Sequence, residues 1–514
     1  MPEPVGFGQR LAQHAISRPD EVAIEFISLN YKRTQISWKQ LESATNRLAR
    51  LIQARGGTKG SMVVVALRNS IEHYSLALAA WKVGACVITL NPEAPKPERD
   101  RILGLVHAPL LVGDWSDSRP LGALTVSDLV EASRFSDAQL QPVVSEPGLA
   151  VPTGGSSGSP KLVLRLGPWI RKPGEFTALE QLAGLEPFQR QLVLGPLFHN
   201  APFTWSHAGL FEGHRLTVME RFDPLLAAEL LESEAIEFAF MVPTMMARIA
   251  RTPGIAGRDL SHINSIFHAG GPCPAWVKRA WMDLLTPSKI REGFGPSEGF
   301  STTVIRGDEW LKHPGSVGRP QMCEIRILDD DLQPVPVGTV GEIFGRPLNQ
   351  EQAAYVYIGA PAAKSATDGF FSAGDLGWID SEGYLYIADR RSDLILRGGA
   401  NVYPAEVEGA LSEHPDIADV AVIGLPHPDL GRTVHAIIQM AAERQPLSAD
   451  VLDEWVRSRL AGYKAPSSYE YVRNLPRDDA GKLRRTKLAA EWGPSERNVL
   501  RPRRNLGAQQ ARSR

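Results

Sequence analysis

Cysteine is scarce in this chain of 514 residues, which holds only Cys86, Cys273 and Cys323, far apart from one another. No Cys-x-x-Cys pair, no His-Glu-x-x-His motif and no other zinc-like spacing is present, which argues against structural zinc. Few, scattered cysteines suit a reducing compartment. We therefore expect a cytoplasmic protein.

An excess of charge of either sign is also absent. Lys and Arg together number 56, Asp and Glu number 58, and the formal net charge is -2. A general nucleic-acid binder needs a basic surface, so we expect no nucleic-acid partner. The exception is residues 494–514, an arginine-rich segment with hardly any apolar residues. This composition predicts a basic, disordered tail, with contact to an anionic partner as the alternative.

Long hydrophobic runs are missing as well. The most apolar region, residues 62–90, is interrupted by five polar residues: Arg68, Asn69, Glu72, His73 and Lys82. A transmembrane helix needs about 20 consecutive apolar residues, so we expect no membrane span. Residues 1–13 lack a cationic region followed by an apolar core, so no secretory signal is expected.

Short apolar runs alternate with helix-like runs through the first 315 residues or so. Residues 61–67 are typical of a buried strand, residues 71–82 of a helix and residues 85–90 of the next strand. The alternation continues through residues 191–195, 215–219, 225–234 and 238–242. It predicts parallel sheets covered by helices.

The pattern changes in the last two fifths of the chain. Residues 324–328 and 341–344 predict short strands joined by Pro/Gly turns, and a small α+β unit begins near residue 390. We predict an α/β fold with a large N-terminal domain of parallel-sheet subdomains plus a β-rich subdomain, and a small mobile α+β C-terminal domain. The predicted boundaries are 1–389 for the large domain, 390–393 for a hinge, 394–493 for the small domain and 494–514 for the tail.

One loop is rich in glycine and hydroxyl groups. Residues 153–161 read Thr-Gly-Gly-Ser-Ser-Gly-Ser-Pro-Lys. Glycine lets backbone N–H groups approach an anion, hydroxyls add donors, and Lys161 adds a positive charge. This combination predicts a polyphosphate site, with a flexible surface loop as the alternative. The spacing is neither that of a Walker A loop nor that of a dinucleotide-binding loop.

Several further motifs follow this loop in a fixed order. They are Pro196-Leu-Phe-His199, Phe294-Gly-Pro-Ser-Glu298, Gly315-Ser-Val-Gly-Arg-Pro320, Ala373-Gly-Asp-Leu376, Asp389-Arg-Arg-Ser-Asp393, Gly399-Ala-Asn-Val-Tyr-Pro-Ala-Glu-Val-Glu408 and Gly481-Lys482. Together they resemble the adenylate-forming superfamily of acyl-CoA synthetases, adenylation domains and luciferases, over about residues 36–487. Ala269-Gly-Gly-Pro-Cys-Pro274 followed by Trp276-Val-Lys278 is most similar to the bile-acid-CoA ligase-like branch.

The resemblance implies that a carboxylic acid is activated by transfer to the α-phosphate of ATP. A free carboxylate is a poor acyl donor, whereas an acyl-adenylate has AMP as a good leaving group. Glu298 would bind Mg²⁺, which bridges phosphate oxygens, and Gly295 and Ser297 belong to the same motif. The loop would hold the β- and γ-phosphates through Thr153, Gly155, Ser156, Ser157, Gly158 and Lys161.

The resemblance also assigns residues to the nucleoside. Phe294 offers a flat face to adenine, and Gly270 and Gly271 would line the other side of the base. Asp375 would accept both ribose hydroxyls, and Arg390 would help to hold the ribose. The alternatives are a core position for Phe294 and turn positions for Glu298 and Asp375.

The small domain is expected to act twice in such an enzyme. Lys482 would enter the site for adenylation, and the domain would then rotate so that Gly398 and Gly399 line a channel for the thiol of CoA. At the hinge, Ser392 stands where many relatives carry Asp or Lys; serine can still cap or form a turn, which allows rotation about this residue.

The acid is expected to be apolar, and cyclic or aromatic acids are candidates. Amino-acid-activating relatives place an aspartate just after the Pro-x-Phe-His region, but residues 200–209 contain no acid. His199 would gate the carboxylate end of the pocket, with a packed histidine as the alternative. Pocket wall and ordinary core are equal alternatives for Phe203, Trp205, Met245, Met246 and Phe300.

Two other functions compete with an acid-CoA ligase. An adenylating amide synthetase of the coronafacic-acid-ligase type would share every step up to the adenylate and would use an amine instead of CoA. A non-catalytic nucleotide-binding protein is opposed by Lys161, Glu298, Asp375, Arg390 and Lys482. The expected partners are therefore a small carboxylic acid, ATP, Mg²⁺ and either CoA or an amine. The sequence leaves the oligomeric state open, a homodimer included.

Overall fold

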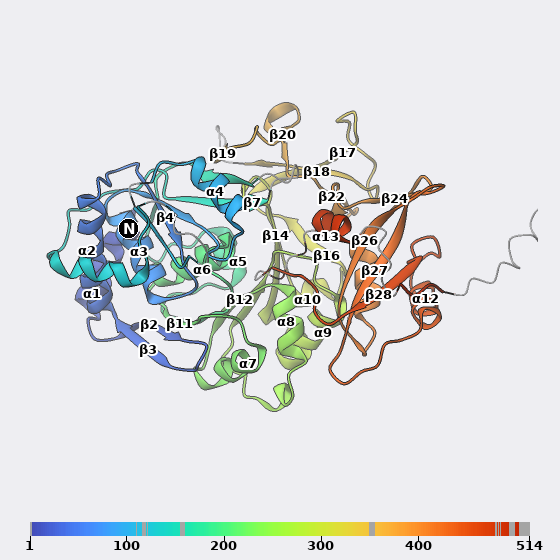
Figure 1. Cartoon of the computed structure of the whole chain (residues 1–514), viewed down its shortest axis with the longest axis horizontal. Coiled ribbons are helices and arrows are strands. Elements are labelled where there is room, and N and C mark those ends of the chain that lie inside the picture. Colours follow the sequence, from blue (N-terminus) through green and yellow to red (C-terminus); the bar gives the residue numbers. More distant parts are fainter. Residues whose placement is uncertain are drawn as a thin grey trace, which may run out of the picture.

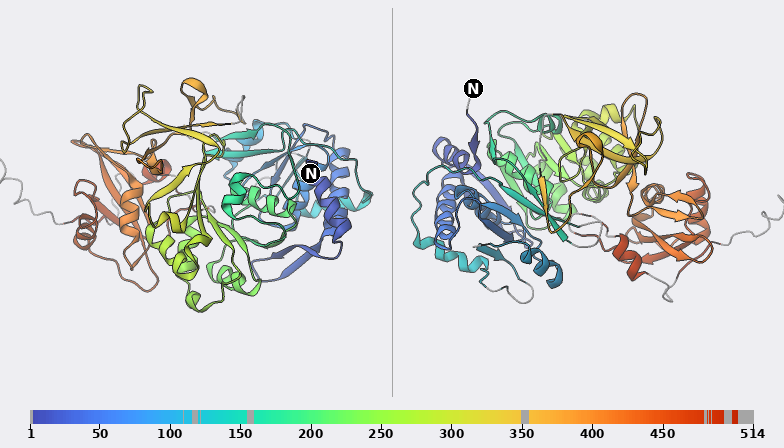
Figure 2. Two further views of the ribbon diagram at one scale, coloured as in Figure 1. Left: turned by 180° about the vertical axis from the view of Figure 1, so that it is seen from behind. Right: turned by 90° about the horizontal axis from the view of Figure 1, so that it is seen from above.

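The computed structural model describes residues 3–108, 110–115, 120, 122–154, 160–348, 355–478, 481, 483, 485–492 and 499–502. The chain forms a large domain and a small domain (Figure 1). The N-terminal region and the small domain lie at opposite ends of the long axis, as both views in Figure 2 also show. None of the helices in these ranges is long and apolar enough to cross a membrane.

The first sheet of the large domain has the strand order β19-β8-β7-β5-β4-β6. Strands β6, β4, β5 and β7 are parallel, and β8 and β19 extend them in antiparallel pairing. The bounds are β4 Met62–Ala66, β5 Cys86–Thr89, β6 Leu110–Gly113, β7 Leu149–Gly154, β8 Pro160–Arg165 and β19 Tyr355–Ile358. Helix α3 (Ile71–Lys82) connects β4 to β5 and begins where the Ser70 side chain accepts a hydrogen bond from the His73 N–H.

Strand β4 is buried on both faces, as its unbroken β-branched run predicts. Val63 and Val65 pack into a core with helix α3, whereas Val64 and Ala66 face a second core with Ile102. The alternation follows the two-residue period of a strand.

The second sheet is longer and continuous. Its parallel part is ordered β14-β13-β12-β10-β11-β2, with β3 at the far edge. The bounds are β2 Val22–Ile27, β3 Arg33–Ser37, β10 Arg190–Val193, β11 Arg215–Met219, β12 Phe238–Met241, β13 Ser265–His268 and β14 Ile290–Phe294.

Beyond β14 the same sheet continues into antiparallel strands, so the predicted β-rich part shares a sheet with the parallel part. These strands are β15 Thr303–Arg306, β16 Ser316–Pro320, β17 Cys323–Leu328, β18 Gly341–Pro347, β20 Lys364–Ser365, β21 Phe371–Ser372, β22 Asp375–Ile379 and β23 Leu385–Arg390.

Helices cover these sheets and contribute to their cores. Helix α2 begins with a capping box between Ser37 and Gln40. The bounds are α1 Phe7–Ser17, α2 Trp38–Ala54, α4 Lys96–Gly104, α5 Ala178–Ala183, α6 Asn200–Phe211, α7 Pro224–Ser233, α8 Pro243–Ala250, α9 Ala275–Leu284 and α10 Gly307–Trp310. Two short strands, β1 Val5–Gly6 and β9 Ile170–Arg171, form a separate pair.

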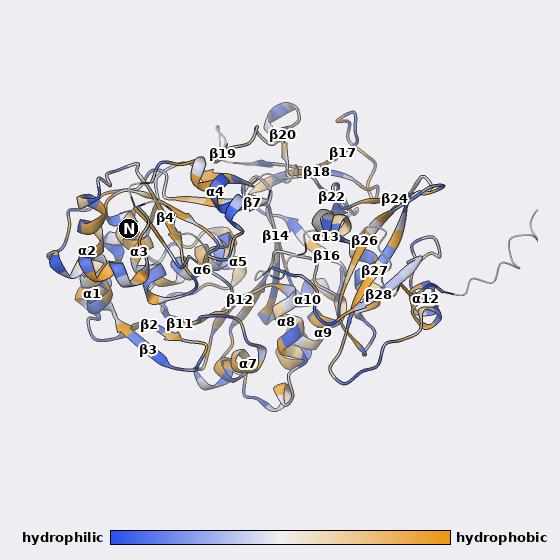
Figure 3. Ribbon diagram, in the orientation of Figure 1, coloured by the Kyte–Doolittle hydropathy of each residue, from blue (hydrophilic) through white to orange (hydrophobic). Residues whose placement is uncertain are grey.

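The small domain packs helices against one mixed sheet. Strand β26 is largely hydrophobic in Figure 3, and Val420 and Val422 from it are buried with Val407 of α11. The bounds are β24 Ile395–Arg397, β25 Ala400–Val402, α11 Pro404–Ser412, β26 Ile417–His427, β27 Gly431–Met440, α12 Ala449–Arg457, β28 Ser468–Val472 and α13 Arg485–Glu491. The predicted fold class, a large α/β domain and a small α+β domain, is therefore confirmed.

The two domains touch near helix α8. Arg251, at the end of this helix, donates hydrogen bonds to the carbonyl oxygens of Ala418 (2.5 Å) and Ile417 (3.0 Å) in the small domain. At the start of α8, a Cβ added to Gly481 would lie 2.0 Å from the Thr244 hydroxyl oxygen. Gly481, the residue before Lys482, therefore packs on the large domain.

Candidate functional site

Several of the predicted site residues lie at or just after the carboxyl ends of parallel strands in the second sheet. His199 comes after β10, Gly270 and Gly271 come after β13, and Phe294 ends β14 just before Glu298. The carboxyl ends of parallel strands meet at one edge of a sheet, which is where α/β proteins bind ligands. The topology therefore brings these segments together.

The predicted phosphate loop is the turn between β7 and β8. Thr153 pairs with Lys161 and Gly154 with Pro160 across this hairpin. The remaining predicted phosphate ligands, Gly155, Ser156, Ser157 and Gly158, lie outside the described residues. The Thr153 hydroxyl oxygen is buried and has no hydrogen-bond partner among the residues that the structure describes. Such a group fits a phosphate oxygen that the loop would bring close.

Lys161 and Glu298 meet between the two sheets. The Lys161 ammonium lies 3.7 Å from the Glu298 carboxylate and 3.3 Å from the centre of the Tyr357 ring, and the Tyr357 hydroxyl donates a hydrogen bond to that carboxylate. Burial lowers the pKa of Lys161; Glu298 opposes this shift and the Arg390 charge adds to it. Burial and the Glu298 carboxylate raise the pKa of Tyr357, so the phenol stays protonated as a donor.

The predicted ribose residues face each other on neighbouring strands. Asp375 on β22 pairs with Arg390 on β23, and the Arg390 Nε donates to the Asp375 Oδ1 at 3.1 Å. Asp375 is buried whereas the Arg390 side chain is 61% exposed. The Arg390 charge also lowers the pKa of Lys161, so the predicted ribose and phosphate residues are close enough to interact electrostatically.

Two glycines, which carry no side chain, lie where the adenine base is expected. Gly270 has φ +88°, and a Cβ on Gly271 would meet no atom within 4 Å. Phe294 is half-buried, as is Ser297, and a Cβ on Gly295 would lie 2.7 Å from the Ser301 carbonyl oxygen. The space beside Gly271 and the exposed part of Phe294 fit a flat ring, and these roles stay predictions.

His199 and the aromatic residues near it differ in their surroundings. His199 is half-buried at the N-terminus of α6, 4.8 Å from the ring centre of Phe198. Phe203 is fully buried, with its ring centre 4.0 Å from that of His207, and Met246 is fully buried in the second-sheet core. These contacts favour the core interpretation for Phe203 and Met246. Trp205 and Met245 also join that core, while Phe300 packs beside Tyr355.

The catalytic lysine predicted for the small domain, Lys482, lies outside the described residues, although Gly481 before it contacts Thr244. Gly398 and Gly399, predicted to line the CoA channel, have φ of +55° and +82°, and Gly399 has open space where a Cβ would point. This open, side-chain-free turn fits a narrow channel.

Glu298 is the carboxylate predicted to bind a metal. Within the described ranges, no group of three His, Cys, Asp or Glu side chains is arranged to hold an ion. Magnesium bound with a nucleotide takes one or two protein carboxylates, phosphate oxygens and water, so a dedicated cage is unnecessary. The buried Glu298 beside Lys161 fits this mode.

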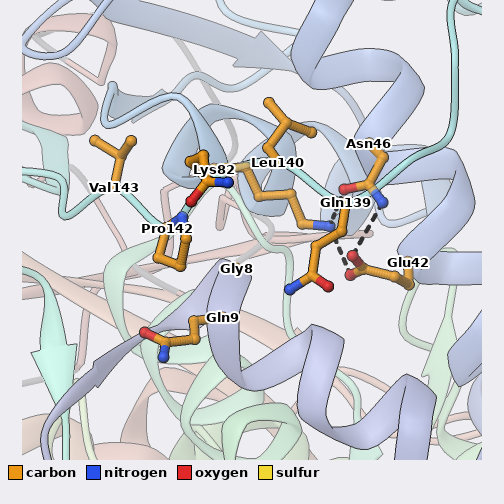
Figure 4. Close-up of a pocket in the computed structure, with 10 residues that line it drawn as sticks. Gly8, Gln9, Glu42, Asn46, Lys82, Gln139, Leu140, Pro142 and Val143 are labelled. Carbon is orange, nitrogen blue, oxygen red and sulfur yellow. Dashed lines mark hydrogen bonds and ion pairs between the residues drawn. The ribbon is translucent and has the colours of Figure 1, made fainter.

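A small cavity lies elsewhere, among α1, α2 and α3 (Figure 4). Its volume is about 20 Å³, room for a water molecule. None of the predicted site residues lines it. The Lys82 ammonium there is held by Glu42 and by the Asn46 side-chain oxygen at 2.6 Å. Burial lowers the pKa of Lys82 to about 8, against the opposing effect of Glu42. This cluster ties α2 to α3 and is structural.

Sequence reasoning missed Tyr357 and Thr244. Tyr357 belongs to an alternating Tyr-Val-Tyr-Ile run that is typical of a strand, but nothing in that run indicates β8 as its neighbour. Thr244 follows the strand-like run 238–242. Its position after the carboxyl end of a strand could have indicated that it lies near the site.

Residues 11–348 of the chain match the AMP-binding enzyme family, and residues 406–482 match the AMP-binding enzyme C-terminal domain. Feruloyl-CoA synthase from Amycolatopsis sp is 30% identical over 473 residues, covering 90% of this chain and 94% of that protein. The 2-succinylbenzoate–CoA ligase from Geobacillus kaustophilus is 30% identical over 491 residues, covering 93% and 96%.

Solved structures of similar fold cover nearly the whole chain. The o-succinylbenzoate coenzyme A synthetase from Bacillus subtilis, in complex with ATP and magnesium ion, is 25% identical with a TM-score of 0.78, covering 95% of this chain and 100% of that one. The amide bond synthetase McbA from Marinactinospora thermotolerans is 22% identical with a TM-score of 0.75, covering 95% and 99%. The likeness to McbA concerns the fold alone.

Proposed function

The chain belongs to the AMP-binding enzyme family and is an adenylate-forming ligase, and we propose that it joins an apolar carboxylic acid to CoA through an acyl-adenylate. The observation that carries the proposal is the meeting of Lys161 with Glu298, next to the Asp375–Arg390 pair. A cation, a buried carboxylate and a diol-binding carboxylate are what a magnesium nucleotide needs.

Each residue of the site has a proposed task. Lys161 and the Thr153 hydroxyl hold the β- and γ-phosphates, and Glu298 holds Mg²⁺, which offsets the phosphate charge. Asp375 accepts hydrogen bonds from the ribose hydroxyls, and Arg390 holds the Asp375 carboxylate in place. Gly270, Gly271 and Phe294 enclose the base, and His199 stands at the carboxylate end of the acid.

The proposed reaction has two steps. In the first, an oxygen of the acid carboxylate bonds to the α-phosphorus of ATP, the bond from that phosphorus to the bridging oxygen breaks, and pyrophosphate leaves. In the second, the CoA sulfur bonds to the acyl carbon, AMP leaves, and the thiol proton passes to solvent. Lys482 lowers the repulsion between carboxylate and α-phosphate in the first step. Gly398 and Gly399 line the path of the thiol in the second step.

The relatives also bear on the identity of the acid and of the group that accepts it. Two of the relatives named above are named for feruloyl and 2-succinylbenzoate, both aromatic acids, which supports an aromatic or cyclic substrate. They are named as CoA enzymes, which supports CoA as the acceptor. An amine acceptor remains the second candidate, since an amide synthetase would share every step up to the acyl-adenylate. The bile-acid-CoA ligase-like branch rests on Ala269–Pro274 and Trp276–Lys278 and stays a proposal.

The test is ATP–pyrophosphate exchange with the whole chain over a panel of carboxylic acids, followed by product analysis with CoA or with amines. We expect Mg²⁺-dependent exchange with aromatic or cyclic acids and a thioester when CoA is added. Abundant amide without thioester would contradict CoA as the acceptor. No acid-dependent exchange across the panel would contradict the proposed activity.

A further inference from the structure

Tyr357 contacts both of the charged groups proposed to handle the phosphates of ATP. It lies on β19, which pairs with β8 so that Tyr357 stands opposite Val163. Its hydroxyl donates to the Oε1 of Glu298, and its ring centre lies 3.3 Å from the Lys161 ammonium. One side chain thus connects the proposed metal ligand to the proposed phosphate ligand.

The hydrogen bond restricts the carboxylate. A bond from a phenol to an ionised oxygen is charge-assisted and stronger than a neutral one. It fixes the rotation of the Glu298 carboxylate, since one oxygen is tied to β19. Partners of this kind orient metal ligands, and losing them weakens metal binding.

The ring restricts the cation. An ammonium over an aromatic face is attracted electrostatically by the ring. Lys161 is half-buried and 3.7 Å from Glu298, so the ring holds the ammonium beside the carboxylate that is proposed to bind the metal.

We propose that Tyr357 is a positioning residue that holds Glu298 for Mg²⁺ and keeps the Lys161 ammonium at the phosphate side of the site. The hydroxyl orients the carboxylate that binds the metal, and the ring holds the Lys161 ammonium. The proposal rests on the proposed function for the identity of the ligand as Mg²⁺ with ATP.

The experiment compares Tyr357→Phe, which loses only the hydroxyl, with Tyr384→Phe. The Tyr384 hydroxyl donates to Glu309 at 2.7 Å, so this control loses the same kind of bond away from the site. The full-length proteins are titrated with MgCl2 at a fixed ATP concentration, without acid, and nucleotide binding is followed by calorimetry. We expect Tyr357→Phe to need about 10-fold more Mg²⁺ for half-saturation, while Tyr384→Phe matches the wild type.

A second variant separates the ring from the hydroxyl. Tyr357→Leu also removes the aromatic face, so we expect weaker ATP binding even in Mg²⁺-free buffer, which Tyr357→Phe should leave unchanged. Thermal unfolding of all variants reports any loss of folding. An unchanged Mg²⁺ requirement in a folded Tyr357→Phe protein would overturn the proposal. Tighter Mg²⁺ binding would also overturn it, because the hydroxyl would then compete with the metal.

The outcomes distinguish this inference from the proposed function. A wild-type protein that binds ATP with Mg²⁺ but exchanges pyrophosphate with no acid contradicts the proposed activity, yet its binding curves still test Tyr357. A wild-type protein that binds no nucleotide overturns both.

Discussion

Asp389 carries a charge in an unfavourable place, at the junction of the two domains. It ends the buried part of β23, and its carboxylate accepts hydrogen bonds from the N–H groups of Arg390 (2.8 Å) and Ala405 (2.9 Å). Burial raises the pKa of Asp389 to about 6, although Arg485 and these hydrogen bonds act in the opposite direction. Desolvation therefore outweighs its partners.

This pKa predicts a pH dependence of stability. The folded protein binds the Asp389 proton more tightly than the unfolded chain, whose carboxyl pKa is about 3.9, so the contribution of this group is full below that value. This contribution to the free energy of unfolding, at most roughly 3 kcal/mol, is lost as the pH rises to about 6. Thermal unfolding at pH 4.5 and 7.5 should show that the wild type loses more stability over this range than Asp389→Asn. Equal losses would contradict the raised pKa.

Individual residues differ in how far their roles were predictable. The segments carrying Asp375 and Arg390 were predicted from motifs and lie on adjacent strands as a hydrogen-bonded pair. Tyr357 was not predicted, because its partners come from segments far away in the chain. Phe203 was left open between pocket and core, since an aromatic residue in a helix has the same local pattern in both.

Among the elements, strand β16 shows why a motif needs glycine. Gly318 has φ +99°, and a Cβ there would lie 2.2 Å from the Val304 carbonyl oxygen on the neighbouring strand β15. The contact is with backbone, which cannot move without breaking the sheet between β14 and β23. The glycine at this position of the Gly315–Pro320 motif is therefore a requirement of the sheet.

We expect Gly318→Ala to destabilise the large domain by about 2–5 kcal/mol, from backbone strain and overpacking together. Gly338→Ala is a matched control, because Gly338 has φ +80° but nothing within 4 Å of a Cβ. The control should cost only about 1–2 kcal/mol of strain. Calorimetric unfolding of the two variants checks this order, and equal losses would show that the Val304 contact is easily relieved.

Most single elements followed from local sequence. The predicted helix 71–82 is α3, and the strand-like runs 215–219 and 238–242 become β11 and β12. What local sequence could not predict is which strands share a sheet. The antiparallel strands after β14 extend the second sheet, while β19 returns to the first, because pairing depends on contacts between segments far apart.

At the scale of the whole molecule, specific contacts at both ends of helix α8 join the two domains. Arg251 donates to two carbonyl groups of β26 and lies over the ring of Trp276, 4.2 Å from its centre. Gly481 meets Thr244 at the other end of α8. Gly481, which precedes Lys482, thus packs on the large domain, as the proposed role of Lys482 in adenylation requires.

We therefore expect Arg251→Ala to slow adenylation more than the transfer of the acyl group from a supplied acyl-adenylate to CoA. Two hydrogen bonds from a charged donor contribute enough to change the domain equilibrium by about 10-fold or more. Arg248→Ala is the control, since Arg248 lies on the same helix and packs over Phe222, 5.1 Å from its ring centre. Equal slowing of both half-reactions, measured separately, would contradict a role in domain position.

Strand β8 is synthesised well before β19, the strand with which it pairs. Chains grow at about 5–20 residues per second, so β19 emerges roughly 10–40 s after β8. During that interval the edge of β8 that carries Lys161 is open, and an open edge invites pairing with other chains. The proposed nucleotide site is therefore completed only after β19 has been synthesised, and a cell short of chaperones should lose this enzyme to aggregation before it loses proteins with local pairing.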